Sequence, residues 1–106
     1  MSYAARADRP ADKAELYAEL HDEILAVLDG EPDRIARMAT MSTMLADAFP
    51  GHIACDGRSN SEIVVPVADA DGRLIAVLDI DSDQFAAFDQ TDATALERLV
   101  KSVFTV

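Results

Sequence analysis

Two short apolar runs constrain the fold of this chain more than any other feature of its sequence. They occupy residues 63–67 and 74–78, are rich in Val, Ile and Leu, and are nearly unbroken, which is typical of strands buried on both faces. The connection between them, residues 68–72, ends in Asp71 and Gly72, which tolerate a positive φ, so we expect an antiparallel hairpin. Pro66 indicates a bulge or an edge position.

Helical periodicity predicts three helices beside this hairpin. The first covers residues 12–29 and is followed by Gly30, a residue suited to a left-handed cap. The second is expected to begin near Pro32 and to end at residues 50–51, and the short connection favours an antiparallel helical hairpin. The third is predicted to start after Phe88, with Asp89 or Thr91 as its cap.

Each predicted helix has an apolar face that we expect to point inward. The expected inward residues are Leu16, Leu20, Ile24, Val27 and Leu28 in the first helix, Ile35, Met38, Leu45 and Phe49 in the second, and Leu96, Leu99, Val100, Val103 and Phe104 in the third. The methionines at positions 38, 41 and 44 are interpreted as core filler.

These elements predict an α+β fold: an antiparallel β-hairpin packed against about three helices. With 106 residues, half of them apolar, the chain is long enough for one modest core, so residues 1–106 are expected to form a single domain, with residues 1–11 as a flexible N-terminus. A lone hairpin is marginally stable and both of its edges offer unpaired backbone groups. We therefore expect dimerisation to complete the sheet.

The charge of the chain narrows the classes of partner. Twenty acidic residues against nine basic ones give a net charge of −11, which repels nucleic acid and anionic membranes and favours a cationic or zwitterionic small ligand. No apolar run approaches the roughly 20 residues that a membrane-spanning helix needs. The first residues lack the apolar stretch of a secretory signal and the chain has one cysteine, so a cytoplasmic location is expected.

Three acidic residues and one thiol are the candidates for chemistry. Asp79 and Asp81 end the second run, where the period of two places them on one face, about 7 Å apart. Glu62 precedes the first run, and Cys55 lies just before a polar loop. Such acids can hold an ammonium group and donate a proton. The alternative is that they are strand-end residues facing water.

A metal site is the other alternative weighed for this region. It would use His52, Cys55 and Asp56, but this spacing lacks the second ligand pair that makes a zinc signature specific. We expect no metal.

Three segments of the chain read AFPGHIACD at 48–56, SNSEIVVP at 59–66 and GRLIAVLDIDS at 72–82. In residues and order they resemble the free methionine-R-sulfoxide reductases, a family of GAF-domain enzymes. The resemblance implies that Cys55 is the catalytic nucleophile and that Glu62, Asp79 and Asp81 hold and activate the substrate, free methionine sulfoxide. It implies a sulfenic acid on Cys55 and no cofactor. Because the chain has no second cysteine, an external thiol such as a thioredoxin-type protein is expected to restore the first.

The chain departs from this family in length. The family's central segment is missing, so the resemblance implies a truncated GAF-like domain, with a homodimer as one way to rebuild the sheet. An engineered deletion, a natural remnant and a partner chain that supplies the missing strands all remain open. The alternative function is a catalytically inactive remnant that binds a small ligand or self-associates.

Overall fold

In the computed structural model, the described residues are 8–49, 51–53 and 59–105, with the backbone alone at 52–53. They form two compact units, and the boundary between the units falls after residue 50. The expectation of one domain over residues 1–106 therefore stays a prediction. In the described part of the chain, no helix is both long and apolar enough to span a membrane.

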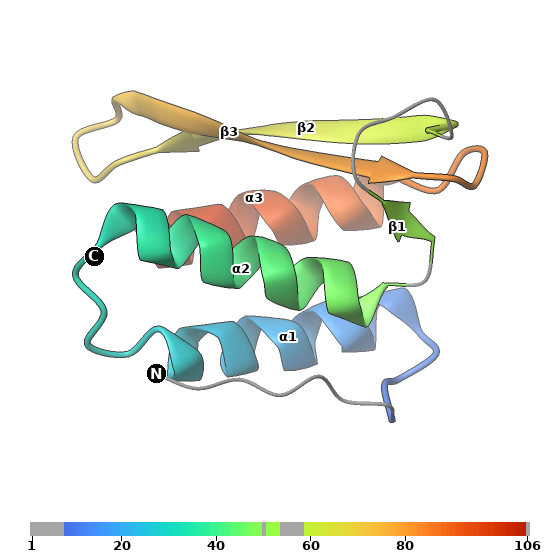
Figure 1. The fold of residues 1–106 in the computed structure, drawn as a ribbon, viewed down its shortest axis with the longest axis horizontal. Helices are drawn as coiled ribbons and strands as arrows, with labels where there is room; N and C mark the ends of the chain where they lie inside the picture. Colours follow the sequence, from blue (N-terminus) through green and yellow to red (C-terminus); the bar gives the residue numbers. More distant parts are fainter. Residues whose placement is uncertain (1–7, 50, 54–58, 106) are drawn as a thin grey trace. The chain divides into compact units, whose positions relative to one another are not determined.

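The first unit is a pair of helices, α1 (Lys13–Val27) and α2 (Arg34–Ala48), which run antiparallel, as predicted (Figure 1). An aspartate caps each helix: the side chain of Asp12 accepts from the Glu15 N–H, and that of Asp33 accepts from the Ile35 and Ala36 N–H groups. The sequence predicted that α2 begins near Pro32, with this proline in its first turn. In the structure Asp33 is the cap, so Pro32 lies before the helix.

The apolar face of each helix is buried at helical spacing. The buried residues are Leu16, Tyr17, Leu20, Ile24, Leu28, Met41, Met44, Leu45 and Ala48. Burial of Met41 and Met44 confirms their packing role, and the Tyr17 and Phe49 rings lie 4.8 Å apart between centroids. The prediction for Ile35 is wrong, since it is 71% exposed. It lies in the first turn of α2, on a different side from the buried residues at 41, 44, 45 and 48.

Arg9 attaches the residues before α1 to that helix. Its guanidinium donates to the carboxylates of Glu19, at 3.2 Å, and Glu23, and its side chain is 9% exposed. Arg9 belongs to the segment 1–11 that was expected to be flexible, and residues 1–7 of that segment lie outside the described residues.

The second unit contains three strands and a helix: β1 (His52–Ile53), β2 (Ser61–Ala68), β3 (Leu74–Ser82) and α3 (Gln90–Phe104). The sheet has the order β1-β3-β2, with both pairs antiparallel, and α3 packs against β2 (Figure 1). This confirms the predicted hairpin and the α+β class. Strand β1 was not predicted, because two residues carry no periodicity.

The sheet is buried on one face only, so the prediction of strands buried on both faces is wrong. On one face, Val65 lies opposite Leu78, and both are buried. On the other face, Val64 and Val77 are 51% and 59% exposed. The runs look unbroken because apolar residues occupy both faces, although one face is open in the single chain.

The hairpin turn and the position of Pro66 follow the prediction. Gly72 has a φ of +81°, and the Asp69 side chain accepts from the Asp71 and Arg73 N–H groups at 2.9 and 3.0 Å. The register shifts between Val67 and Ala68, and β2 is the outer strand of the described sheet, where a proline is tolerated. Strand β1 pairs only with the end of β3, so the other edge of β3 is largely open among the described strands.

Helix α3 is fixed at its start by a capping box. The Asp89 side chain accepts from the Thr91 N–H at 2.9 Å, and the buried Asp92 side chain accepts from the Asp89 N–H at 2.8 Å. All five residues expected to point inward from this helix are buried.

Replacing the capping residue should destabilise the chain measurably. We expect Asp89→Ala to lower the free energy of unfolding by about 1 kcal/mol, because the first turn of α3 loses its acceptor. Glu97→Ala removes the same charge from an exposed position within α3 and should cost less than about 0.5 kcal/mol. Urea unfolding followed by circular dichroism measures both, and equal effects of the two variants would contradict a role for the cap.

Candidate functional site

The pairing of β2 with β3 brings the three predicted acids together. Glu62 lies directly opposite Asp81, and Asp79 lies opposite Val64, two residues before Asp81 along the same strand. Directly opposed residues and residues two apart share one face of a sheet, so all three side chains project from the open face. An oxygen of each carboxylate lies within 4.8 Å of an oxygen of the other two. We call Glu62, Asp79 and Asp81 the acidic cluster.

The three acids differ in their exposure to solvent. Glu62 and Asp79 are exposed, whereas Asp81 is buried, with 5% of its surface accessible. Like charges placed directly across a strand pair repel each other, and burial of Asp81 adds a desolvation cost. The arrangement is therefore locally unfavourable, which is a common property of sites selected for binding or catalysis.

Hydrogen bonds from the residues before Glu62 hold this part of the sheet in place. The hydroxyl of Ser59 donates to Asp81 Oδ1 at 3.0 Å. The side-chain amide of Asn60 donates to the Asp83 carbonyl at 2.7 Å, and the Ser61 hydroxyl donates to the Gln84 carbonyl at 2.6 Å. Three consecutive side chains thus connect the start of β2 to the end of β3 and the loop after it.

The predicted nucleophile, Cys55, lies outside the described residues, as do the side chains of His52 and Asp56. The described residues on either side of this segment are informative. Before it, Ile53 lies opposite Asp81 in the β1–β3 pairing. After it, Ser59 donates its hydrogen bond to the same aspartate. Ile53 and Ser59, the described residues before and after Cys55, therefore both lie beside Asp81, and the position of the thiol itself stays a prediction.

Carboxylates in this arrangement can interact with a positive charge of more than one kind. An ammonium group can donate up to three hydrogen bonds to them, and a hard divalent cation can take the same oxygens as ligands. The expectation that no metal is bound stays a prediction.

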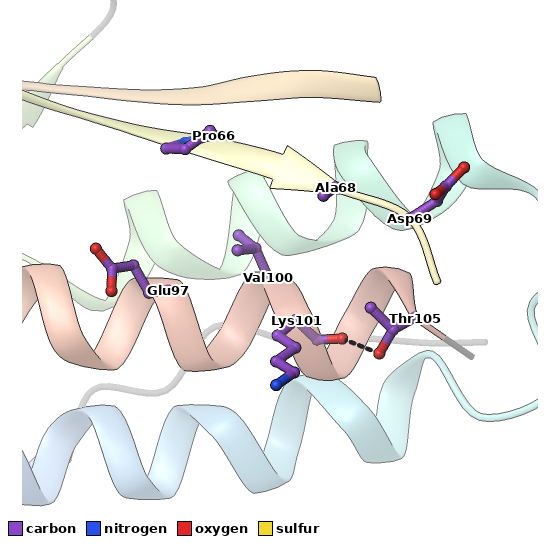
Figure 2. A pocket seen from close by; sticks show the side chains of 7 residues that line it. All are labelled: Pro66, Ala68, Asp69, Glu97, Val100, Lys101 and Thr105. Atoms are coloured by element: carbon purple, nitrogen blue, oxygen red, sulfur yellow. Dashed lines mark hydrogen bonds between the residues drawn. The ribbon is translucent and has the colours of Figure 1, made fainter. Parts of the chain in front are cut away.

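A pocket lies elsewhere in the second unit, between β2 and α3 (Figure 2). Its volume is about 250 Å³, and it is lined by Pro66, Ala68, Asp69, Glu97, Val100, Lys101 and Thr105. It shares no residue with the acidic cluster. Its polar side chains combine two carboxylates with the ammonium of Lys101 and show no concentration of one charge, so it does not compete with the cluster as a candidate site.

Sequence reasoning missed the part played by Ser59. The residue was noted within the segment at 59–66, yet no contact was assigned to it. The available signal was its position: a hydroxyl two residues before the strand that carries Glu62, in a sequence where Ser, Asn and Ser follow one another.

Comparisons with known proteins find similarity in part of the sequence and in the fold. No family model matches the chain. The free methionine-R-sulfoxide reductase of Saccharomyces cerevisiae is 49% identical over 55 residues, which are 52% of this chain and 31% of that protein. The GAF domain-containing protein A of Dictyostelium discoideum is 47% identical over 55 residues, which are 52% of this chain and 34% of that protein.

A solved structure matches over nearly the whole chain. It is the free methionine-R-sulfoxide reductase of Neisseria meningitidis in complex with its substrate, with a TM-score of 0.82 and 28% identity, and the match covers 96% of this chain and 93% of that one.

The matched segment spans about a third of the length of the two sequence relatives but half of this chain, so those relatives are longer. This partial coverage fits the shortened GAF-like domain that the sequence predicted. In sequence over half of its length, and in fold over nearly all of it, the chain is similar to free methionine-R-sulfoxide reductases.

Proposed function

We propose that this chain reduces free L-methionine-(R)-S-oxide to methionine, with Cys55 as the nucleophile and an external thiol as the reductant. The observation that carries the proposal is the acidic cluster, three carboxylates gathered at one end of the sheet in a fold shared with such reductases. The residues that flank the thiol-bearing segment support this role, because Ile53 lies opposite Asp81 and Ser59 donates a hydrogen bond to it.

The acidic cluster suits a zwitterionic substrate. Its carboxylates would bind the ammonium group of the amino acid, and one protonated acid would donate to the sulfoxide oxygen. Glu62 and Asp79 are exposed, so an incoming substrate would reach them first, and an oxygen of Asp81 lies within 4.8 Å of both.

In the proposed reaction the Cys55 thiolate attacks the sulfoxide sulfur as its oxygen is protonated. The attack forms a bond between the two sulfurs. This bond and the S–O bond of the substrate then break as the protonated oxygen passes to the cysteine sulfur, which leaves methionine and a sulfenic acid. The substrate sulfur gains two electrons and the cysteine sulfur loses two. One external thiol then forms a disulfide with Cys55 and releases water, and a second thiol frees the cysteine.

The reductant and the compartment form part of this proposal. The sequence contains one cysteine, so the second thiol must come from another molecule, such as a thioredoxin-type protein. A reducing cytoplasm supplies such thiols. No cofactor enters the proposed reaction.

Self-association is proposed alongside the activity. The outer edge of β2 has no strand beside it in the described sheet, and the open face exposes Val64 and Val77. Unpaired edges and exposed apolar residues favour pairing with another chain. The same features support the alternative function, a remnant that binds a small ligand or self-associates without turnover.

Activity should depend on the single thiol. We expect the chain to release methionine from free methionine-R-sulfoxide with dithiothreitol present, and Cys55→Ser to lose at least 100-fold in kcat/KM, since the hydroxyl is a far weaker nucleophile. Methionine is quantified by chromatography, and circular dichroism checks that both proteins are folded. Absence of turnover by the folded parent would favour the inactive remnant, and equal turnover by both proteins would exclude Cys55 as the nucleophile.

Without a reductant the reaction should stop after one event. Because each chain holds one cysteine, we expect release of at most one methionine per chain, together with a sulfenic acid that dimedone traps. Mass spectrometry of the protein detects the dimedone adduct. Several turnovers in the absence of thiol would contradict the proposed cycle.

The acidic cluster should lower the free energy of unfolding and favour substrate binding. We expect Asp79→Asn to raise the free energy of unfolding by about 0.5 kcal/mol at low salt, because repulsion of Glu62 and Asp81 is relieved. The same variant should raise the KM for methionine sulfoxide. Asp22→Asn makes the same substitution at an exposed position of α1 and should leave both quantities nearly unchanged. Urea unfolding and initial rates measure them, and equal stability of the two variants would contradict the repulsion.

A further inference from the structure

We propose that Ser59 is a positioning residue, which orients the Asp81 carboxylate for the ammonium group of the substrate. This inference rests on the proposed function and adds to it a residue to which the sequence gave no role. Ser59 would act through Asp81 and not by contact with the reacting atoms.

The Asp81 carboxylate is buried and depends on the protein for hydrogen bonds. Its surface is 5% exposed, so its carboxylate has little access to water and needs a donor from the protein. The Ser59 hydroxyl is such a donor, at 3.0 Å from Oδ1, and Ser59 is itself half-buried. A hydrogen bond to a charged acceptor is stronger than one between neutral groups.

Two other carboxylates surround Asp81. Carboxylates of Glu62 and Asp79 lie within 4.8 Å, and their repulsion acts to turn the Asp81 side chain away from the cluster. The Ser59 hydroxyl opposes this repulsion at one oxygen. Because this hydrogen bond uses Oδ1, it leaves the lone pairs of the second oxygen of Asp81 for an ammonium group.

The backbone next to Ser59 is anchored to the end of β3 and the loop after it. The next residue, Asn60, donates its backbone N–H to the Ser82 carbonyl at 2.8 Å and its side-chain amide to the Asp83 carbonyl at 2.7 Å. A residue fixed in this way holds its hydroxyl with little loss of entropy on binding, which is the requirement for a preorganised site.

The kinetic test compares Ser59→Ala, Ser59→Thr and Ser61→Ala in the full chain. We expect Ser59→Ala to raise the KM for methionine sulfoxide about tenfold and to change kcat by less than about twofold. This rise in KM corresponds to the loss of one hydrogen bond to a charged group. Ser59→Thr keeps the hydroxyl and should restore the KM. Ser61→Ala removes a hydroxyl bonded to the Gln84 carbonyl and should change stability but not the KM. An unchanged KM in Ser59→Ala would overturn the proposal.

A second measurement separates this inference from the proposed activity. The ¹³C resonance of the Asp81 carboxyl group, assigned through its loss in Asp81→Asn, should shift in Ser59→Ala and return in Ser59→Thr. This readout needs no turnover, so a shift in an inactive chain would support the contact while the proposed function fails. An Asp81 resonance that is the same in the parent and in Ser59→Ala would refute the positioning role.

Discussion

The pairing of β2 with β3 is the interaction on which the rest of the second unit depends. Its register sets Glu62 opposite Asp81 and places Asp79 beside them, so one choice of pairing creates the whole acidic cluster. A shift by one residue would move the apolar residues from the buried face to the open one. The burial of Val65 and Leu78 therefore fixes the register and holds the acids together although they repel each other.

The polar residues at the start of β2 hold it to β3 where the buried apolar pairs end. The apolar pairs end at Ile63 and Ile80, and beyond them the side chains of residues 59–61 hold the two strands together through hydrogen bonds. The candidate site thus lies where apolar packing gives way to polar contacts. A sheet can bring charged groups close at such a position without placing them in its core.

Much of this arrangement was predictable from local pattern. The three helices and the hairpin follow from periods of 3.6 and 2, and the same period of 2 placed Asp79 and Asp81 on one face. The pattern failed where local sequence carries no information. Exposure of Ile35 and of one sheet face depends on what packs nearby, strand β1 is too short for a period, and the contact of Ser59 joins residues 22 positions apart. Cys55 was predicted to be the nucleophile, and it lies outside the described residues.

The position of Pro66 has a consequence for how the sheet could grow. Proline has no N–H, so the outer edge of β2 is a poor template at residue 66 and beyond it the register shifts. A strand added to this edge would pair best with residues 61–65, the half that bears Glu62. The added strand would then lie beside Glu62. Addition of a strand and access to the carboxylates would therefore be linked equilibria.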